Sequence, residues 1–121
     1  MTVAYWILAG LTAAFYLYSG VLKAVRSAEQ LRPMMGWVDS VPMTFVRTIG
    51  VLEILGAIGL ILPPLTGIAP WLAFAAAIAF FLLQIGATTL HLRRGESSVV
   101  GLNLVLLVEG ALLIWLATIW L

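Results

Sequence analysis

Residues 45–62 of this chain read FVRTIGVLEILGAIGLIL, an apolar run that contains one acid, Glu53. A helix rises about 1.5 Å per residue, so about 20 apolar residues cross a hydrocarbon core of ~30 Å. Pro63 and Pro64 follow directly, and we expect this pair to end the helix, because proline lacks a backbone N–H and clashes with the preceding turn. The run is therefore predicted to be a membrane-spanning helix.

Three further runs have the same character. Spans are predicted over residues 3–22, 71–90 and 99–121, the last with Glu109 near its middle. Hydrophobic residues make up 64% of the 121 positions and charged residues only 9%, with a mean hydropathy of +1.17. A soluble domain carries about 25% charged residues. The sequence thus predicts an all-α integral membrane four-helix bundle, forming a single domain over residues 1–121.

Charge and cysteine content exclude several classes of function. The formal net charge of +1 argues against a nucleic-acid partner. The absence of cysteine excludes disulfides, thiol redox chemistry and iron–sulfur clusters. With one histidine, bis-histidine haem ligation is excluded, and His91, Glu53 and Glu109 together make a poor metal site. No intrinsic cofactor or metal is expected.

The connection between the first two spans, residues 23–44, is long and mixes charged with apolar residues. We expect a short amphipathic helix over residues 24–31, followed by an irregular interfacial segment that carries Trp37. A partly re-entrant lid over the bundle is the alternative. All six cations flank this connection or the third one, so the positive-inside rule predicts cytoplasmic connections there and both termini outside. These cations are Lys23, Arg26, Arg32, Arg47, Arg93 and Arg94.

Two carboxyl groups lie where lipid disfavours charge. Glu53 is about 9 Å deeper than Arg47, and Glu109 lies about 15 Å into the fourth span. An ionisable group inside a membrane costs at least ~2.5–3.5 kcal/mol on insertion scales, so each is a candidate functional residue.

Other polar residues are expected at similar depths in the membrane, and several of them lie on one face of a predicted helix. The first span carries one polar face, spaced by 7, 4, 3 and 4 residues: Tyr5, Thr12, Tyr16, Ser19 and Lys23. The predicted middle layer of the bundle comprises Tyr16, Glu53, Gln84 and Glu109, and a second layer nearer the cytoplasm comprises Lys23, His91 and Asn103. Asn103 and Glu109 are about 120° apart around their helix, so both point inward only if one faces a helix–helix seam.

Structural roles are the alternative for each of these residues. Glu53 and Glu109 can serve as protonated hydrogen-bonding groups between helices, and Gln84 and Asn103 as interhelical hydrogen-bonding partners. Lys23 can extend to the headgroups, and His91 can be an ordinary interfacial residue beside Arg93 and Arg94.

Three stretches carry a family resemblance. Residues 50–64 (GVLEILGAIGLILPP) resemble the second-span signature of the DoxX-like family of small bacterial membrane proteins. Residues 18–23 (YSGVLK) and 86–91 (GATTLH) are similar to the ends of that family's first and third spans. The family takes its name from a subunit of a thiosulfate:quinone oxidoreductase, and Lys23, Glu53 and His91 fall on its polar positions. The resemblance implies a bacterial cytoplasmic (inner) membrane protein.

These observations favour a binding module for a lipophilic molecule such as a quinone or an isoprenoid. Lys23 or His91 would bind a carbonyl head while Glu53 exchanges a proton, with Gln84 and Asn103 as further contacts. A redox role requires a bound quinone or an oxidoreductase partner. Homo-oligomers are compatible with so small a membrane protein.

Two other functions stay open. The second is a membrane-embedded isomerase, cyclase or epoxide-opening enzyme that uses Glu53, Glu109 and Tyr16 for acid–base chemistry. The third is proton-coupled transport, which the lack of an acid in the first span disfavours.

Overall fold

The computed structural model describes the backbone of residues 1–121 and the side chains of all residues except 97–99. The described backbone contains helices and no strand, which confirms the all-α class. The elements are α1 (Thr2–Val25), α2 (Ala28–Leu31), the 3₁₀ helix η1 (Gly36–Ser40), α3 (Met43–Thr66), α4 (Leu72–Arg93), α5 (Ser97–Ala117) and the 3₁₀ helix η2 (Thr118–Trp120). Four of them, α1, α3, α4 and α5, are long and apolar enough to cross a membrane.

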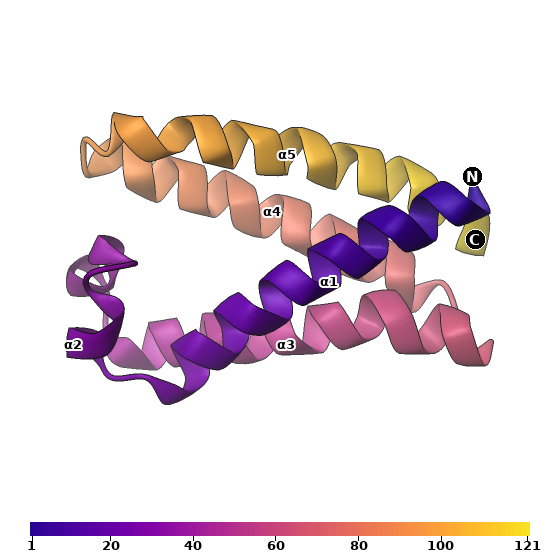
Figure 1. Ribbon diagram of the computed structural model, residues 1–121, viewed down its shortest axis with the longest axis horizontal. Helices are drawn as coiled ribbons and strands as arrows, with labels where there is room; N and C mark the ends of the chain where they lie inside the picture. The colour runs from indigo at the N-terminus through magenta and orange to yellow at the C-terminus, as the bar shows by residue number, and fades with distance from the viewer.

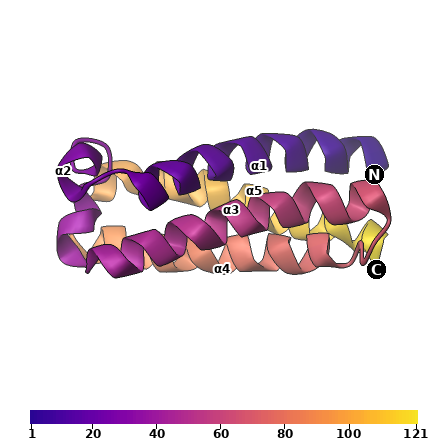
Figure 2. The same ribbon diagram turned by 90° about the horizontal axis from the view of Figure 1, so that it is seen from below.

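The long helices form two packed pairs, α1 with α3 and α4 with α5, and α3 also packs against α4 (Figure 1). The contact between α1 and α5 is shorter, because the two helices diverge towards the end of the bundle where α2 lies (Figure 1). Both termini lie at the opposite end (Figures 1 and 2). Among these four packed pairs, α1 and α3 are therefore in the most extensive contact and α1 and α5 in the least.

Two glycines explain the tight pair. A Cβ atom added to Gly20 on α1 would lie 2.7 Å from the carbonyl oxygen of Gly50 on α3, and one added to Gly50 would lie 2.7 Å from that of Gly20. No side chain fits between the two backbones at this point. Small residues commonly allow such close contacts between membrane helices, where packing rather than hydrophobic burial drives association.

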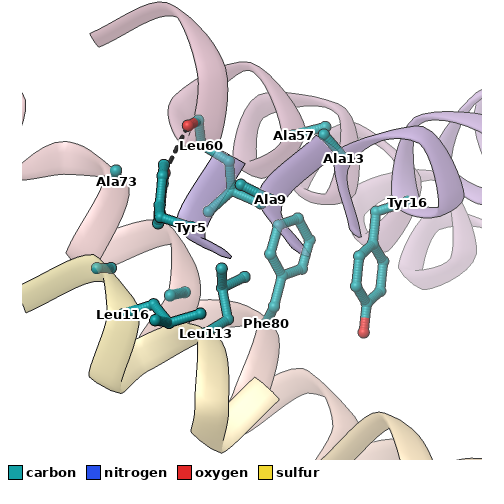
Figure 3. Close-up of a cluster of buried hydrophobic side chains, with 12 residues drawn as sticks. Tyr5, Ala9, Ala13, Tyr16, Ala57, Leu60, Ala73, Phe80, Leu113 and Leu116 are labelled. Carbon is teal, nitrogen blue, oxygen red and sulfur yellow. Dashed lines mark hydrogen bonds between the residues drawn. The ribbon is translucent and has the colours of Figure 1, made fainter. Parts of the chain in front are cut away.

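The prediction that Pro63 and Pro64 end the second span is wrong, because α3 continues through both prolines to Thr66. Pro64 has no N–H to donate to the carbonyl of Leu60 four residues earlier. The hydroxyl of Tyr5 on α1 donates to that carbonyl instead, at 2.6 Å (Figure 3). Gly67 then ends the helix with a left-handed φ of 75°, and its N–H donates to the carbonyl of Pro63.

The predicted helix over residues 24–31 is also wrong in its bounds. α1 continues to Val25, and α2 is a four-residue turn that begins at the capping box formed by Ser27 and Gln30. The rest of the connection folds over the ends of α1 and α3. Its side chains Leu31 and Val38 are buried there against Leu22 and Val46.

A second apolar cluster fills the middle and the opposite end of the bundle (Figure 3). Alanines from α1, α3 and α4 keep these helices close, while Phe80 of α4 stacks on Tyr16 of α1 with centroids 4.0 Å apart and planes at 13°. In Figure 3 the Tyr16 hydroxyl points away from α1. The stack fixes the position of this polar group in the bundle.

Candidate functional site

The polar face predicted on α1 lies inside the bundle. Its five residues are all buried: Tyr5, Thr12, Tyr16, Ser19 and Lys23. The helical spacing therefore predicted correctly which side of α1 faces its neighbours. These residues have different partners along the helix, and three separate polar contacts result.

The first contact is a buried ion pair between α1 and α3. Lys23 Nζ lies 2.5 Å from Glu53 Oε1, Ser19 also hydrogen-bonds to this carboxyl group, and Glu53 is only 1% exposed. Lys23 Nζ is 5.4 Å from the centroid of Trp37, which the first connection places over this end of the pair. Ser19 thus contacts the carboxyl group of the pair, and Trp37 lies near its ammonium group.

This ion pair contradicts the predicted separation of Lys23 and Glu53 into two layers. Side chains on a helix lean towards its N-terminus. Lys23, near the C-terminal end of α1, therefore extends into the bundle and not out to the headgroups. Its charge neutralises that of Glu53.

The second contact joins α1 to α4. Gln84 Nε2 donates to the Tyr16 hydroxyl at 2.7 Å, and both side chains are buried. Gln84 Oε1 has no hydrogen-bond partner among the described residues.

The third contact joins α1 to α5. The Thr12 hydroxyl donates to Glu109 and lies 2.8 Å from the carbonyl oxygen of Leu8. Glu109 is only partly buried. It lines a groove of about 190 Å³ on the side of the bundle, where α1 and α5 diverge. The other lining residues are Leu8, Leu11, Thr12, Phe15, Tyr16 and Leu106.

Asn103 and Glu109 occupy different faces of α5, as their spacing requires. Asn103 is 5% exposed and engaged within the bundle, whereas Glu109 faces the seam with α1. One of the two thus faces a helix–helix seam.

His91 belongs to a cluster at the bundle end and not with Lys23. Its Nδ1 lies 3.2 Å from Glu96 Oε1, which also accepts from Arg94 Nε at 2.7 Å. Arg94 donates in turn to the Ser40 hydroxyl, so this cluster ties the α4–α5 turn to η1. Hydrogen bonds from Arg94 and then from His91 lower the pKa of Glu96 below its ordinary value.

Sequence reasoning missed the role of Arg47. Its Nη1 donates to the carbonyl oxygens of Lys23 at 2.8 Å and Arg26 at 2.5 Å. A cation at this position complements the negative end of the α1 dipole. A larger groove of about 580 Å³ runs past Arg47 on the outer face of α3, away from the three polar contacts. Among the described residues, no group of three or more His, Asp or Glu side chains could hold a metal ion.

Comparison with known families gives one match. The family model described as the DoxX-like family matches residues 7–116 of this chain. No match is found among curated proteins or among solved structures.

Proposed function

This chain belongs to the DoxX-like family, and on that premise we propose that it binds a lipophilic small molecule whose polar head enters the groove between α1 and α5. Glu109, Thr12 and Tyr16 are the polar residues that line this groove. The ligand class is a quinone-like or isoprenoid-like molecule, which reaches the groove sideways from the bilayer.

One observation carries the proposal: a carboxyl group lies in an opening on the side of a membrane bundle. Ionisable groups in spans are costly and commonly mark functional sites. A cation beside the group offsets part of that cost, so an acid without one has more need of another partner. Glu53 has such a cation at 2.5 Å, whereas Glu109 has a threonine hydroxyl as its partner. The proposed ligand contact therefore shifts from Glu53 to Glu109.

The size of the groove limits what enters it. Sites for whole drug-sized ligands measure about 300–1,000 Å³, and this groove measures about 190 Å³. It accommodates a polar head and its first carbons. Leu11 and Phe15 line it and are 66% and 43% exposed, which provides an apolar path for the tail towards the lipid.

The remaining features of the site belong to the same proposal. We place the chain in the bacterial cytoplasmic membrane because of its family membership. We place both termini outside because its cations lie on or beside the first and third connections. The Lys23–Glu53 and His91–Glu96 pairs lie outside the groove, and we assign them a structural role. If the ligand is a quinone, electrons come from an oxidoreductase partner.

Two probes test this function, farnesol and a benzoquinone with a ten-carbon tail, titrated into purified protein in lipid nanodiscs by calorimetry. We expect at least one probe to bind the natural protein. Glu109→Gln weakens that binding by about tenfold, the order expected for a lost charge-assisted hydrogen bond.

A steric test is independent of hydrogen bonding. Leu106→Trp fills the groove and abolishes binding, whereas Val108→Trp, at a 71% exposed position on the same helix, leaves it unchanged. Absence of binding for both probes, or equal affinities in Leu106→Trp and the natural protein, would refute the proposed site.

An acid–base enzyme that uses Glu53 and Glu109 is the second candidate. One observation favours it: Glu109 and Tyr16, two of its three proposed catalytic groups, line the same groove. Mass spectrometry of an unsaturated isoprenoid incubated with the protein tests it. A product with a moved double bond, absent with Glu53→Gln and with Glu109→Gln, supports catalysis, and unchanged substrate contradicts it.

A further inference from the structure

An unpaired oxygen lies beside the proposed site. Gln84 is 7% exposed, and its Oε1 finds no hydrogen-bond partner among the described residues. Buried polar atoms in native proteins almost always have a partner. In a membrane the need is stronger, because lipid chains supply no hydrogen bonds. The oxygen is therefore a reason to look for a donor that the protein itself does not provide.

The neighbouring groups define what such a donor must be. The Tyr16 hydroxyl accepts from Gln84 Nε2, which leaves its own hydrogen to donate. Tyr16 also lines the α1–α5 groove, together with Glu109. The groove thus ends at Tyr16. Gln84 is not a lining residue and lies directly behind Tyr16, with its buried Oε1 as an unused acceptor.

The distance between the two atoms suits one bridging oxygen, which reaches the enclosed Gln84 Oε1 once the Tyr16 or Gln84 side chain shifts towards the groove. Gln84 Nε2 is 2.7 Å from the Tyr16 oxygen. With C=O and C–N bonds of about 1.2 and 1.3 Å, Oε1 lies within about 5 Å of that oxygen. A single oxygen atom about 3 Å from each lies within normal hydrogen-bond distance of both.

We infer that the ligand head carries a hydroxyl group, which accepts from the Tyr16 hydroxyl and donates to Gln84 Oε1. The ligand is then a lipophilic alcohol. A ketone, quinone or ether can accept from Tyr16 but cannot donate, and it leaves Gln84 Oε1 unpaired. This inference rests on the proposed function, since it assigns the chemical class of the molecule in the same groove.

Farnesol and farnesyl methyl ether form a matched pair of probes, because they share the chain and the oxygen and differ in the donated hydrogen. Their affinities for the natural protein in nanodiscs are measured by calorimetry. We expect farnesol to bind at least about tenfold tighter, since a site built to bind a hydroxyl rejects analogues that cannot pair its buried groups.

Gln84→Met separates hydrogen bonding from fit. This substitution removes the amide oxygen and keeps a side chain of similar length. It should lower the affinity for farnesol and leave the affinity for the ether unchanged. The ratio of the two affinities then comes close to one. Thr89→Val, on the exposed side of α4, removes a hydroxyl bonded only to its own helix and serves as the control that keeps the natural ratio.

The outcomes distinguish the two proposals. Equal affinities for the two probes in the natural protein refute the inference that the ligand is an alcohol. The groove then still stands as a binding site. A preference for farnesol that persists in Gln84→Met reflects the bulk of the methyl group and also refutes it. If neither probe and no quinone binds, the proposed function fails and the inference fails with it. Should Gln84→Met not fold, the ratio in the natural protein still decides.

Discussion

The two interfaces of α1, one with α3 and one with α5, each contain a carboxyl group, and the surroundings of the two groups differ. Along α3, backbones touch at Gly20 and Gly50, and Glu53 is enclosed beside Lys23. Along α5, the helices diverge, and Glu109 lines a groove with only a threonine hydroxyl as partner. Both residues look alike in the sequence, as single acids within apolar runs.

The difference shows that depth in the membrane does not decide the role of an acid. A close contact and a neighbouring cation make Glu53 a structural link between two helices. An open seam and an uncharged partner leave Glu109 accessible from the side. Substitutions on the two seams, followed by unfolding measurements, test this difference.

Lys23→Met should cause the largest loss of stability, because it leaves Glu53 buried without its cation. Removing one partner of a buried ion pair costs about 3–5 kcal/mol. The matched change on the other seam, Thr12→Val, should cost about 1 kcal/mol or less, the usual value of a hydrogen bond between membrane helices. Denaturant titration in mixed micelles measures both.

The double variant Lys23→Met/Glu53→Gln provides the control. Without a charge on either side, most of the lost free energy of unfolding should return. Equal losses for Lys23→Met and Thr12→Val would show that the two seams do not differ in this way.

Gly20→Ala should have the next largest effect. The added methyl group meets the Gly50 carbonyl oxygen, so α1 and α3 must move apart, at a cost of about 1–3 kcal/mol. Gly10→Ala on the same helix meets nothing within 4 Å and should leave the unfolding free energy almost unchanged. The same titration compares them, and a harmless Gly20→Ala would disprove the close contact.

Tyr5→Phe tests the far end of the tight seam. Without the hydroxyl, the Leu60 carbonyl loses its donor, at a cost of about 1 kcal/mol. Pro64→Ala should reduce this loss, because alanine restores the N–H that proline lacks. A double-mutant cycle measures the coupling, and a coupling of zero would rule out the substitution of one donor for another.

Glu96, a half-buried residue at the end of the bundle, lies outside both seams, and its effect should be the smallest. Its pKa is lowered in the folded protein by Arg94 and His91, so its contribution is present above the ordinary pKa of glutamate, about 4.3. That contribution is lost as the pH falls through the folded pKa. Unfolding midpoints of the natural protein and Glu96→Gln should therefore differ at pH 6 and converge on acidification. A difference that stays constant would contradict this cause.

The four helices could be predicted from the sequence because the thickness of the bilayer sets their length. Helical spacing also identified the buried face of α1, including Thr12 and Tyr16. Neither rule indicates which helices become neighbours. The pairing of Lys23 with Glu53 and the opening beside Glu109 both depend on how α1 lies between α3 and α5.

The two prolines show the same limit in one place. The prediction that Pro63 and Pro64 end the second span is wrong, since α3 continues through both. The Leu60 carbonyl, to which Pro64 cannot donate, accepts from Tyr5, 55 residues away along the chain. A local rule cannot include a partner at that distance.

The hydrogen bond from Tyr5 to Leu60 has a consequence for biogenesis. A span whose carbonyl lacks a donor is poorly suited to leave the translocon alone, because the hydrocarbon interior offers no substitute. Since α1 is synthesised first, it can supply this hydroxyl as α3 emerges. We therefore expect the two helices to enter the bilayer as a preassembled hairpin, onto which α4 and α5 dock later.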